Sequence, residues 1–561
     1  MKTLLTNAKI FNAFSCSLLD QSVLLEDGMI AGVGEFDPQL ADLVVDLEHK
    51  ILCPGFIDAH IHIESTTLTP YELARAQIPF GTTAIVADPH EIANVCGQDG
   101  IEFMIQSSQG LPLDVYFMLP SCVPATPIKD SGAVLRASDL RPFYKHERVL
   151  GLAEVMNVPA VLNNDPEMMA KIADAKANNA AIDGHSPMLS GPDLDAYIKA
   201  GIQTDHECAA FEEAKSKIEK GMFIQIRQGT AAKNLNDLIR LFEYPWCLRS
   251  CICTDDKHPD DLKKTGHING ILKEAVALGA DPLHALLMST WNPAQIYKMT
   301  KKGAIAPGYD ADLIVLDDLK DFHVSKVFKN GKEIYSSGVL QDFEKPKVDS
   351  ALQEKLFHSM NMSFVEPDSF RFDHQGVRKA HVIGHSTGSL LTEDLILDVD
   401  FDFMNGVNPE KDLVKIAVMD RHHNSGRMSL GLIHGMGLKE GALASTVAHD
   451  SHNLIAMGTN PADMALASNT LIERGGGLCA VKDGQILAFL PLPIGGLISA
   501  ETYEKTAEAN EELTKAIHEM GSGQELFMSM AFMSLPVIPS IKITTYGLTN
   551  DQLEIIDFLA E

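Results

Sequence analysis

The sequence has no uninterrupted hydrophobic run long enough to cross a membrane. Its most apolar stretch, "ILAFLPLPIGGLI" at 486–498, is broken by proline and glycine, whereas a transmembrane helix needs about 20 apolar residues in succession. The amino-terminal stretch "MKTLLTNAKIFNAFSC" also lacks the continuous apolar core of a secretion signal, because lysine and asparagine interrupt it. We therefore expect a cytoplasmic protein that does not bind membranes.

Basic residues are scarce relative to acidic ones. The 561 residues include 46 Lys and Arg against 76 Asp and Glu, which gives a formal net charge of −30 at pH 7. A charge of this sign repels nucleic acid phosphates and anionic lipids, so we expect no nucleic acid and no membrane among the partners. A small neutral or cationic substrate fits better.

The cysteines are too irregular for a disulfide framework. They number nine and are scattered along the chain, which again indicates a reducing cytoplasm. Cys247, Cys251 and Cys253 lie close together in "CLRSCIC", but their spacing matches no zinc finger and the segment is typical of a strand. We expect buried apolar thiols there rather than metal ligands.

What the chain does contain is a change of pattern along its length. Positions 1–50 have the pattern of short strands separated by turns, and this pattern returns at 301–345. Between them, at 51–300, strands and helices alternate about eight times over roughly 250 residues, the rhythm of a (β/α)8 barrel. We expect an α/β fold with this TIM-like barrel, a small composite β domain from both flanks and an additional C-terminal α/β domain at 346–561. The stretch "QDFEKPKVDSALQEKL" is expected to be a charged connector.

Two histidines stand on an apolar strand near the start of the predicted barrel. In "PGFIDAHIHIE" His60 and His62 are two residues apart, so on a strand their side chains share one face. They would project into the barrel near the strand's carboxyl end, where barrel enzymes have their sites. The motif alone is equally compatible with a hydrogen-bonded pair of histidines and with a metal site.

Later strand ends favour the metal site. Predicted strands end in Glu154, in His185 and in His206, and another ends in the pair Asp255 and Asp256. The carboxyl ends of barrel strands meet at one face of the barrel, so we expect these side chains to gather there. Imidazoles and carboxylates without thiolates suit Zn, Fe or Mn in a catalytic rather than a structural site.

Taken together, the motifs resemble the adenine deaminase family of the amidohydrolase superfamily. The superfamily resemblance rests on "PGFIDAHIHIE", the later His, His and Asp, and "GAIAPGYDADLIVLD"; the family resemblance rests on "DPHEIANVCG", "GLAEVMN", "DGHSP", "TDHE" and "AHDSHNLIAMG". It covers almost the whole chain and implies two divalent metal ions per chain, Mn²⁺ or Fe²⁺ first and Zn²⁺ as the alternative. The metal ligands that it implies are His60, His62, Glu154, His185, His206 and Asp255.

The resemblance also implies the reaction, which is hydrolytic deamination of adenine to hypoxanthine and ammonia by a metal-activated hydroxide in purine salvage. Glu154 would bridge the two ions, where many superfamily members have a carbamylated lysine. Asp255 would be a ligand and would also carry a proton to the leaving amine. Mononuclear deaminases of the superfamily have a glutamate where this chain has Met188. The ring proton must then come from Asp256, from Glu91 or from a group of the C-terminal unit.

Other polar residues near these motifs have two interpretations each. Asp88, His90 and Glu91, in "ADPHEI", are predicted to contact the substrate or to support the ligands; for the first two a proline turn with an Asp cap is the alternative. The segment "AHDSHN" would act as a lid, bind a further ion or form a polar loop. Its candidate residues are His449, Asp450 and His452.

Two rival functions stay open. The first is a related hydrolase that acts on another aminopurine or on a cyclic amide, because fold and metal do not fix the substrate. The second is a catalytically inactive homologue that serves as a scaffold, against which the complete set of six ligands argues. A homo-oligomer is expected for a large enzyme of this kind.

Overall fold

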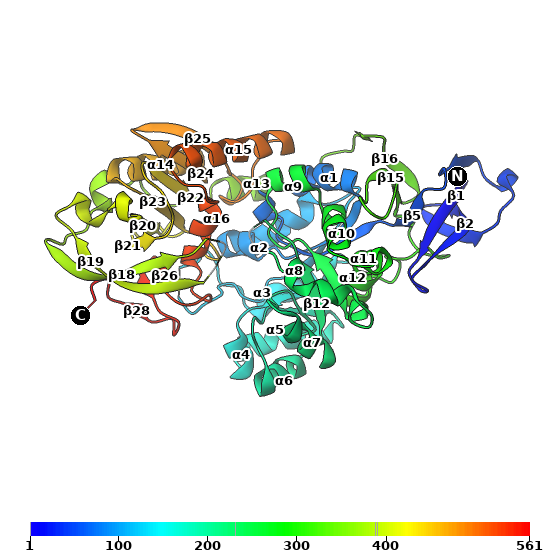
Figure 1. Ribbon diagram of the computed structural model, residues 1–561, viewed down its shortest axis with the longest axis horizontal. Helices are drawn as coiled ribbons and strands as arrows, with labels where there is room; N and C mark the ends of the chain where they lie inside the picture. The colour runs from blue at the N-terminus through cyan, green and yellow to red at the C-terminus, as the bar shows by residue number, and fades with distance from the viewer. Residues whose placement is uncertain (1, 129, 231, 388, 390, 561) are drawn as a thin grey trace.

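The computed structural model describes residues 2–128, 130–230, 232–387, 389 and 391–560. Figure 1 shows an elongated molecule with the N-terminal strands at one end and the C-terminal unit, coloured yellow to red, at the other. A central region of parallel strands and helices lies between them. Within the described residues, no helix combines the length and the apolar character that a membrane crossing requires.

A nine-stranded sheet joins two distant parts of the chain. Its order is β17-β16-β15-β14-β5-β1-β2-β3, with β4 paired to β1. The strands are β1 (Lys2–Asn12), β2 (Ser17–Glu26), β3 (Met29–Gly34), β4 (Leu43–Asp46), β5 (Ile51–Pro54), β14 (Leu313–Leu316), β15 (Val324–Lys329), β16 (Lys332–Ser336) and β17 (Val339–Leu340). The junction is the antiparallel pairing of β14 with β5, so the chain leaves this sheet at Pro54 and returns to it at Leu313.

The central region contains two parallel sheets. One has the order β10-β9-β8-β7-β6 and the other β11-β12-β13. Their strands are β6 (Phe56–Ile61), β7 (Thr82–Ala87), β8 (Asp114–Leu119), β9 (Val149–Val155), β10 (Ala181–Gly184), β11 (Thr204–Asp205), β12 (Phe223–Arg227) and β13 (Ser250–Cys253). The sequence predicted this alternation of short strands with helices, although β11 has only two residues.

Backbone hydrogen bonds connect the two parallel sheets on both sides. Gln203 N donates to Ile182 O at 2.9 Å, which links the approach to β11 with β10. Asp255 N donates to His60 O at 2.9 Å, and His62 N donates to Asp255 O at 3.2 Å. The segment after β13 therefore lies beside the end of β6, and residues from the first and the last parallel strand come together.

Helices follow the parallel strands along the chain. They are α1 (Pro70–Gln77), α2 (His90–Ser107), α3 (Ala137–Leu140), α4 (Val158–Leu162), α5 (Pro166–Ala177), α6 (Gly191–Ala200), α7 (Phe211–Glu219), α8 (Leu235–Leu238), α9 (Pro259–Thr265), α10 (Ile268–Ala277), α11 (Pro282–Ser289) and α12 (Trp291–Ile296). Local sequence explains their starts. In α5, Pro166 takes the first position and the carboxylate of Asp165 accepts from Met168 N, as expected of an N-cap followed by proline.

The C-terminal unit is built on an eight-stranded sheet with the order β19-β18-β21-β20-β23-β22-β24-β25. Its strands are β18 (Val377–His385), β19 (Thr392–Asp400), β20 (Leu413–Met419), β21 (Met428–His434), β22 (Ala442–Ser445), β23 (Leu454–Gly458), β24 (Gly477–Lys482) and β25 (Gln485–Pro491), and a small sheet adds β26 (Lys542–Thr544), β27 (Gly547–Thr549) and β28 (Ile555–Ile556). Its helices are α14 (Pro461–Arg474), α15 (Tyr503–Glu519) and α16 (Leu526–Ala531).

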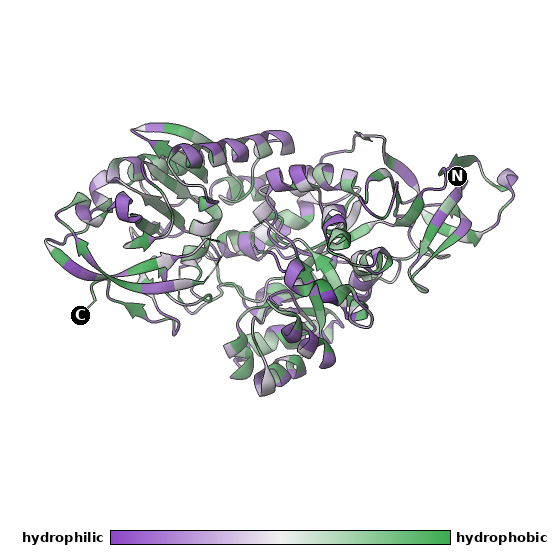
Figure 2. Cartoon of the chain, viewed as in Figure 1, coloured by the Kyte–Doolittle hydropathy of each residue, from purple (hydrophilic) through white to green (hydrophobic). Residues whose placement is uncertain are grey.

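Helices cover both faces of this sheet. Leu443 packs with α15 and α16, whereas its neighbours Ala442 and Ala444 pack with α14, as the two-residue period of a strand requires. Figure 2 shows the same segregation, with hydrophobic strands inside and hydrophilic helix faces outside. The predicted charged connector contains a helix, α13 (Ser350–Phe357), because the carboxylate of Asp349 caps its first turn.

Candidate metal centre and active site

The six candidate ligands gather at the carboxyl ends of the parallel strands. His60 and Glu154 belong to β6 and β9, and the other four follow β6, β10, β11 and β13 by one or two residues. All are buried except His185, whose side chain is 20% exposed. Strands that run in parallel present these ends to one side, which is why residues almost 200 positions apart meet.

Glu154 lies at the centre of the group. Its Oε2 is 2.8 Å from His185 Nδ1 and 3.1 Å from His206 Nε2, and its Oε1 is 3.5 Å from His62 Nε2. Burial alone would raise the pKa of this carboxyl, but hydrogen bonds from His185 and His206 lower it well below its ordinary value. The carboxylate is therefore ionised and touches histidines from three strands.

Asp255 occupies the other side of the group. Its Oδ1 is 3.2 Å from His62 Nε2 and 3.5 Å from His60 Nε2, and its Oδ2 accepts from Arg227 at 3.0 Å. Burial opposes ionisation here too, but His60, His62 and Arg227 lower the pKa of Asp255 well below its ordinary value. Two buried carboxylates among four imidazoles form a strongly polar centre.

These residues fit divalent metal ions. The ligand atoms of His60, His62 and Asp255 lie within 4.8 Å of one another, and so do those of His60, Glu154 and His206. Buried His60 Nε2 makes no hydrogen bond to any described residue, as expected of a nitrogen whose partner is an ion. A set of imidazole nitrogens and carboxylate oxygens suits Mn, Fe or Zn.

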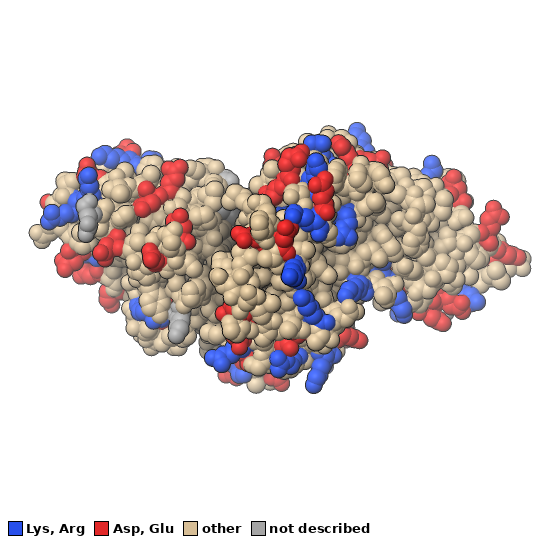
Figure 3. Space-filling model, turned by 90° about the horizontal axis from the view of Figure 1, so that it is seen from below, with Lys and Arg blue, Asp and Glu red and all other residues tan. Residues whose placement is uncertain are grey.

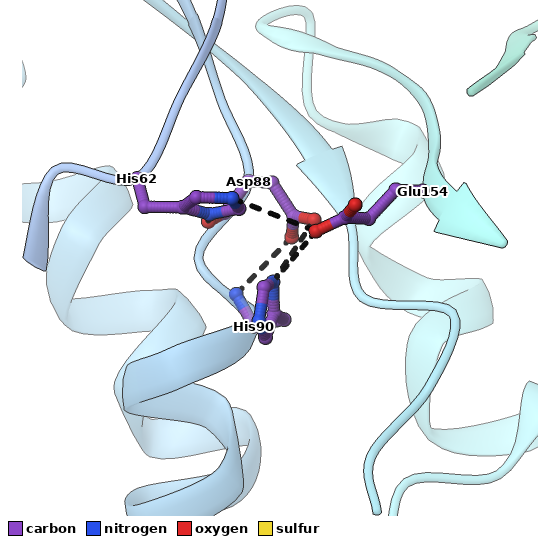
Figure 4. A group of neighbouring side chains, drawn as sticks. All are labelled: His62, Asp88, His90 and Glu154. Atoms are coloured by element: carbon purple, nitrogen blue, oxygen red, sulfur yellow. Dashed lines mark hydrogen bonds and ion pairs between the residues drawn. The ribbon is translucent and has the colours of Figure 1, made fainter. Parts of the chain in front are cut away.

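Asp88 and His90 adjoin this centre from β7 and α2. Figure 4 shows His62, His90 and Glu154 pointing toward one another beside Asp88. The backbone O of Asp88 is 3.1 Å from His62 Nδ1; because a carbonyl only accepts, Nδ1 carries the proton and Nε2 keeps its lone pair. The Asp88 carboxylate in turn lies 3.1 Å from His90 Nδ1.

Asp256 and Glu91 lie next to the centre and are joined by a serine. The Ser65 hydroxyl is 2.5 Å from Asp256 Oδ1 and 3.2 Å from Glu91 Oε1. Burial and the neighbouring Asp255 raise the pKa of Asp256. Asp256 and Glu91 also line the cavity above the centre, whereas Asp88 does not.

The cavity above the centre has a volume of about 430 Å³ and is walled by two parts of the chain. Candidate ligands form its floor, and the C-terminal unit contributes the opposite wall. The residues of that wall include His449, Asp450, Phe532, Leu535 and Ile538. A concave, largely apolar site with a few convergent polar groups is the usual form of a small-molecule site.

Comparison with known proteins agrees with this arrangement. Residues 51–334 match the amidohydrolase family, and residues 389–552 match the adenine deaminase C-terminal domain. An "Adenine deaminase 2" from Carboxydothermus hydrogenoformans is 43% identical over 97% of this chain and 95% of its own length. Adenine deaminases from Desulfatibacillum aliphaticivorans and Geobacillus kaustophilus are 42% and 41% identical, over 98% and 97% of this chain and 95% and 94% of their own lengths. The chain belongs to the adenine deaminase family.

This membership confirms the family that the sequence motifs indicated. The adenine deaminase C-terminal domain is also the part that supplies the upper wall of the cavity. The nine cysteines are all free, and burial raises the pKa of Cys251 and Cys253 well above its ordinary value. Cys247, Cys251 and Cys253 are the buried thiols that the sequence predicted.

Sequence reasoning missed two charged residues of the site. Glu207 Oε1 is 3.4 Å from His206 Nε2 and 3.6 Å from His185 Nδ1, and it forms an ion pair with Arg227. The motif "TDHE" contained the signal for Glu207, since a carboxylate follows a predicted ligand directly. Arg227 has no such signal, because it lies at the end of β12 in a segment without other candidates.

Proposed function

We propose that this protein is an adenine aminohydrolase, which hydrolyses adenine to hypoxanthine and ammonia in purine salvage. The observation that carries the proposal is the combination of full-length adenine deaminase relatives with a cavity of small-molecule size over a complete ligand set. The enzyme would hydrolyse a carbon–nitrogen bond of a cyclic amidine, and the names of the relatives support the free base adenine as its substrate.

Two divalent metal ions per chain, Mn²⁺ or Fe²⁺ with Zn²⁺ as the alternative, would occupy the centre. His60, His62 and Asp255 would hold the first ion, and His185 and His206 the second, with Glu154 shared between them. The ligand atoms of His60, His62 and Asp255 lie within 4.8 Å of one another, and those of His185 and His206 form another such group with Glu207, which supports this division. The chemistry that such ions supply is a lowered pKa of water, which provides a nucleophile at neutral pH.

The chain's own residues would move the protons. Asp255 is ionised and faces the cavity, so it can take a proton from the attacking water and deliver it to the leaving amine. Arg227, 3.0 Å from Asp255 Oδ2, would hold this carboxylate in place. Asp256 is proposed as an auxiliary proton carrier because it lines the cavity beside Asp255.

The residues after β7 would surround the substrate and the ligands. His90 and Glu91 line the cavity and are proposed to contact the base. Asp88 does not line the cavity and would act through two histidines. Its backbone carbonyl orients His62, and its carboxylate orients His90.

We also propose a division of the chain into domains. The hydrogen bonds that join β10 to β11 and β13 to β6 support a closed (β/α)8 barrel at 51–300. The pairing of β14 with β5 supports a composite β domain from 1–50 and 301–345, extended to Pro54 by β5. The remaining residues, 346–561, would form the adenine deaminase C-terminal domain.

The proposal extends to the setting of the enzyme. Nine free cysteines support a cytoplasmic location. Figure 3 shows acidic and basic side chains interspersed on one face, and the net charge of −30 supports a role without nucleic acid or membrane partners. A homo-oligomer is proposed on the ground of size alone.

Ammonia release from a panel of substrates tests the function. The Mn²⁺-loaded protein is expected to release ammonia from adenine and not from guanine or adenosine. It is also expected to leave the ring of a cyclic amide such as dihydrouracil intact, which is followed by chromatography because ring opening releases no ammonia. Preferred turnover of another aminopurine or of the cyclic amide would support the alternative amidohydrolase activity instead.

A further inference from the structure

The C-terminal unit places one imidazole inside the cavity of the parallel-strand region. His449 lies between β22 and β23 and is only 4% exposed. Its amide N donates to Ala531 O at 3.0 Å, and its carbonyl accepts from the Ser534 hydroxyl at 3.2 Å. The ring stacks on Phe532 with centroids 4.5 Å apart and planes at 19°. Backbone and ring contacts together fix the position of the imidazole.

Glu91, from the first turn of α2, fixes its orientation. Glu91 Oε1 is 3.2 Å from His449 Nδ1. Burial would raise the pKa of Glu91, but His449 lowers it well below its ordinary value, so the carboxylate is ionised and accepts. His449 Nδ1 therefore carries a proton, and Nε2 is the nitrogen left for another partner. Among the described residues none forms a hydrogen bond with that nitrogen.

A metal ion does not explain this cluster. Ligand-type atoms of Glu91, His449 and His452 lie within 4.8 Å of one another, but Ala448 N donates to His452 Nδ1 at 3.2 Å. That nitrogen must be unprotonated, so neutral His452 carries its proton on Nε2 and cannot use it as a ligand. Burial lowers the pKa of His452 well below its ordinary value, which keeps it neutral. The cluster is therefore an ion pair of Glu91 and His449 beside a neutral His452.

We propose that His449 is a catalytic residue contributed by the C-terminal unit, whose Nε2 donates to a ring nitrogen of the purine base, and that Glu91 is its positioning residue. This inference rests on the proposed function and supplies the ring-proton donor for which the sequence offered only candidates. Burial alone would lower the pKa of His449, but Glu91 raises it to about 9, so the imidazole is protonated at neutral pH and Nε2 is a donor.

The protons balance over one turnover. As the water oxygen bonds to C6, the electron pair of the C6–N1 double bond moves to N1, which takes the Nε2 proton of His449. One water proton passes through Asp255 to the amine, which leaves as ammonia when the C6–N bond breaks. The second water proton is released as the C6 carbonyl forms, and it restores the imidazolium. The product carries hydrogen on N1, as hypoxanthine does.

The primary test compares two replacements of His449 in the full Mn²⁺-loaded enzyme. His449→Phe fills the space without a donor, so kcat is expected to fall by about 10²–10⁴-fold. The Kd for 6-methylpurine, which has a lone pair on N1 and no amine to lose, is measured by calorimetry and is expected to rise at least about tenfold. His449→Gln keeps an N–H donor but no transferable proton, so it is expected to preserve most of the binding while kcat falls.

Measurements of metal content and of melting temperature distinguish the loss of a proton donor from the loss of metal and from misfolding. His434→Phe, at the end of β21 and outside the cavity, is the matched control and should leave kcat, Kd and melting temperature unchanged. All variants should keep about two ions per chain. Wild-type kcat and Kd in His449→Phe would overturn the proposal, and so would metal loss with activity restored by added Mn²⁺.

Two variants of Glu91 test the positioning role. Glu91→Gln still offers an oxygen to Nδ1 and should retain most of the 6-methylpurine binding, whereas Glu91→Ala should approach His449→Phe in both kcat and Kd. Equal effects of Gln and Ala would contradict positioning through the contact between Glu91 and Nδ1. If the unchanged enzyme binds 6-methylpurine but releases no ammonia from adenine, the proposed function fails and the binding comparison still decides the role of His449. Binding of no purine at all would overturn both.

Discussion

At the scale of single residues, a backbone carbonyl decides which nitrogen of His62 can bind a metal ion. The Asp88 carbonyl accepts a hydrogen bond from His62 Nδ1, so Nδ1 keeps its proton. The nitrogen available to a metal ion is Nε2, 3.2 Å from Asp255 and 3.5 Å from Glu154. The same carboxylate of Asp255 also accepts from Arg227. Because Arg227 holds one oxygen of Asp255, the other oxygen can gain or lose a proton while the carboxylate stays in position.

Replacement of Asp255 separates metal binding from proton transfer. Asp255→Asn keeps an oxygen ligand but cannot take a proton, so kcat for adenine should fall by about 10²–10⁴-fold while most of the metal stays bound. His60→Ala removes a nitrogen with no other described hydrogen-bond partner and should instead lower the metal content. Metal analysis beside steady-state kinetics distinguishes the two. Equal and mild effects of both would count against the assigned roles.

At the scale of elements, one buried lysine forms hydrogen bonds to residues at the carboxyl ends of two strands. Lys217 on α7 is buried, and its Nζ donates to Ser186 O at 2.6 Å and to Asp205 Oδ2 at 2.9 Å. These acceptors are the chain neighbours of His185 and His206. The lysine therefore holds in register the loops that present both candidate ligands of the second ion.

Loss of the Lys217 hydrogen bonds should weaken metal binding. Lys217→Met preserves length without a donor, and the affinity for the more weakly bound Mn²⁺ should drop by about 10–100-fold, with activity restored at higher Mn²⁺. Lys215→Met on the same helix is the control, since Lys215 is 36% exposed. Metal titration that gives the same affinity for both variants would refute the role of Lys217.

A buried ion network joins β14 and β15 to the parallel strands. Asp312 accepts from Lys302 at 2.5 Å and from Lys329 at 2.7 Å, and both lysines also reach Asp114 on β8. Burial would raise the pKa of Asp312, but Lys329 and Lys302 lower it below its ordinary value near 4. Its contribution to stability is therefore complete above about pH 4 and is lost as the pH falls below that.

The network predicts a pH-dependent effect of one substitution. Asp312→Asn leaves two buried lysines short of one anion, so the free energy of unfolding at pH 7 should fall by about 3–5 kcal/mol. The difference from the unchanged protein should begin to shrink below about pH 4, because the Asp312 carboxyl binds a proton there in the unfolded chain while it stays ionised in the folded protein. Urea unfolding midpoints at pH 7 and pH 3 measure this. Asp321→Asn, in an exposed ion pair, should change neither midpoint, and a difference that grows in acid would contradict the sign.

The sequence predicted the site where it depended on local pattern. The two-residue spacing of His60 and His62 and the strand ends at Glu154, His185 and His206 indicated that these side chains lie close together, and the structure has them at the carboxyl ends of the parallel strands. Their role as metal ligands stays a prediction. The sequence did not predict the helix in the connector, because the start of this helix depends on a single cap, Asp349, in a charged stretch. Strand period and strand ends are local properties, whereas a cap is a weak signal among other acidic residues.

At the scale of the whole molecule, contacts between distant segments complete the cavity. Glu91 and His449 are 3.2 Å apart although α2 and the loop after β22 belong to different units. Helix α15 packs against α9 and α1, and Arg75 on α1 forms an ion pair with Glu504 on α15. The motif "AHDSHN" already indicated one loop as a lid. No periodicity in the sequence indicates that residues 532–539 complete the upper wall of the site, so that part of the wall could be found only in the structure.

A binuclear adenine deaminase needs both of its ions for full turnover. Ammonia release from adenine is followed while metal-stripped protein is titrated with Mn²⁺. Activity is expected to appear with metal and to saturate near two ions per chain, because Glu154 touches histidines of both ligand groups. Saturation at one ion would contradict the shared role of Glu154, and no ammonia at any loading would contradict the substrate.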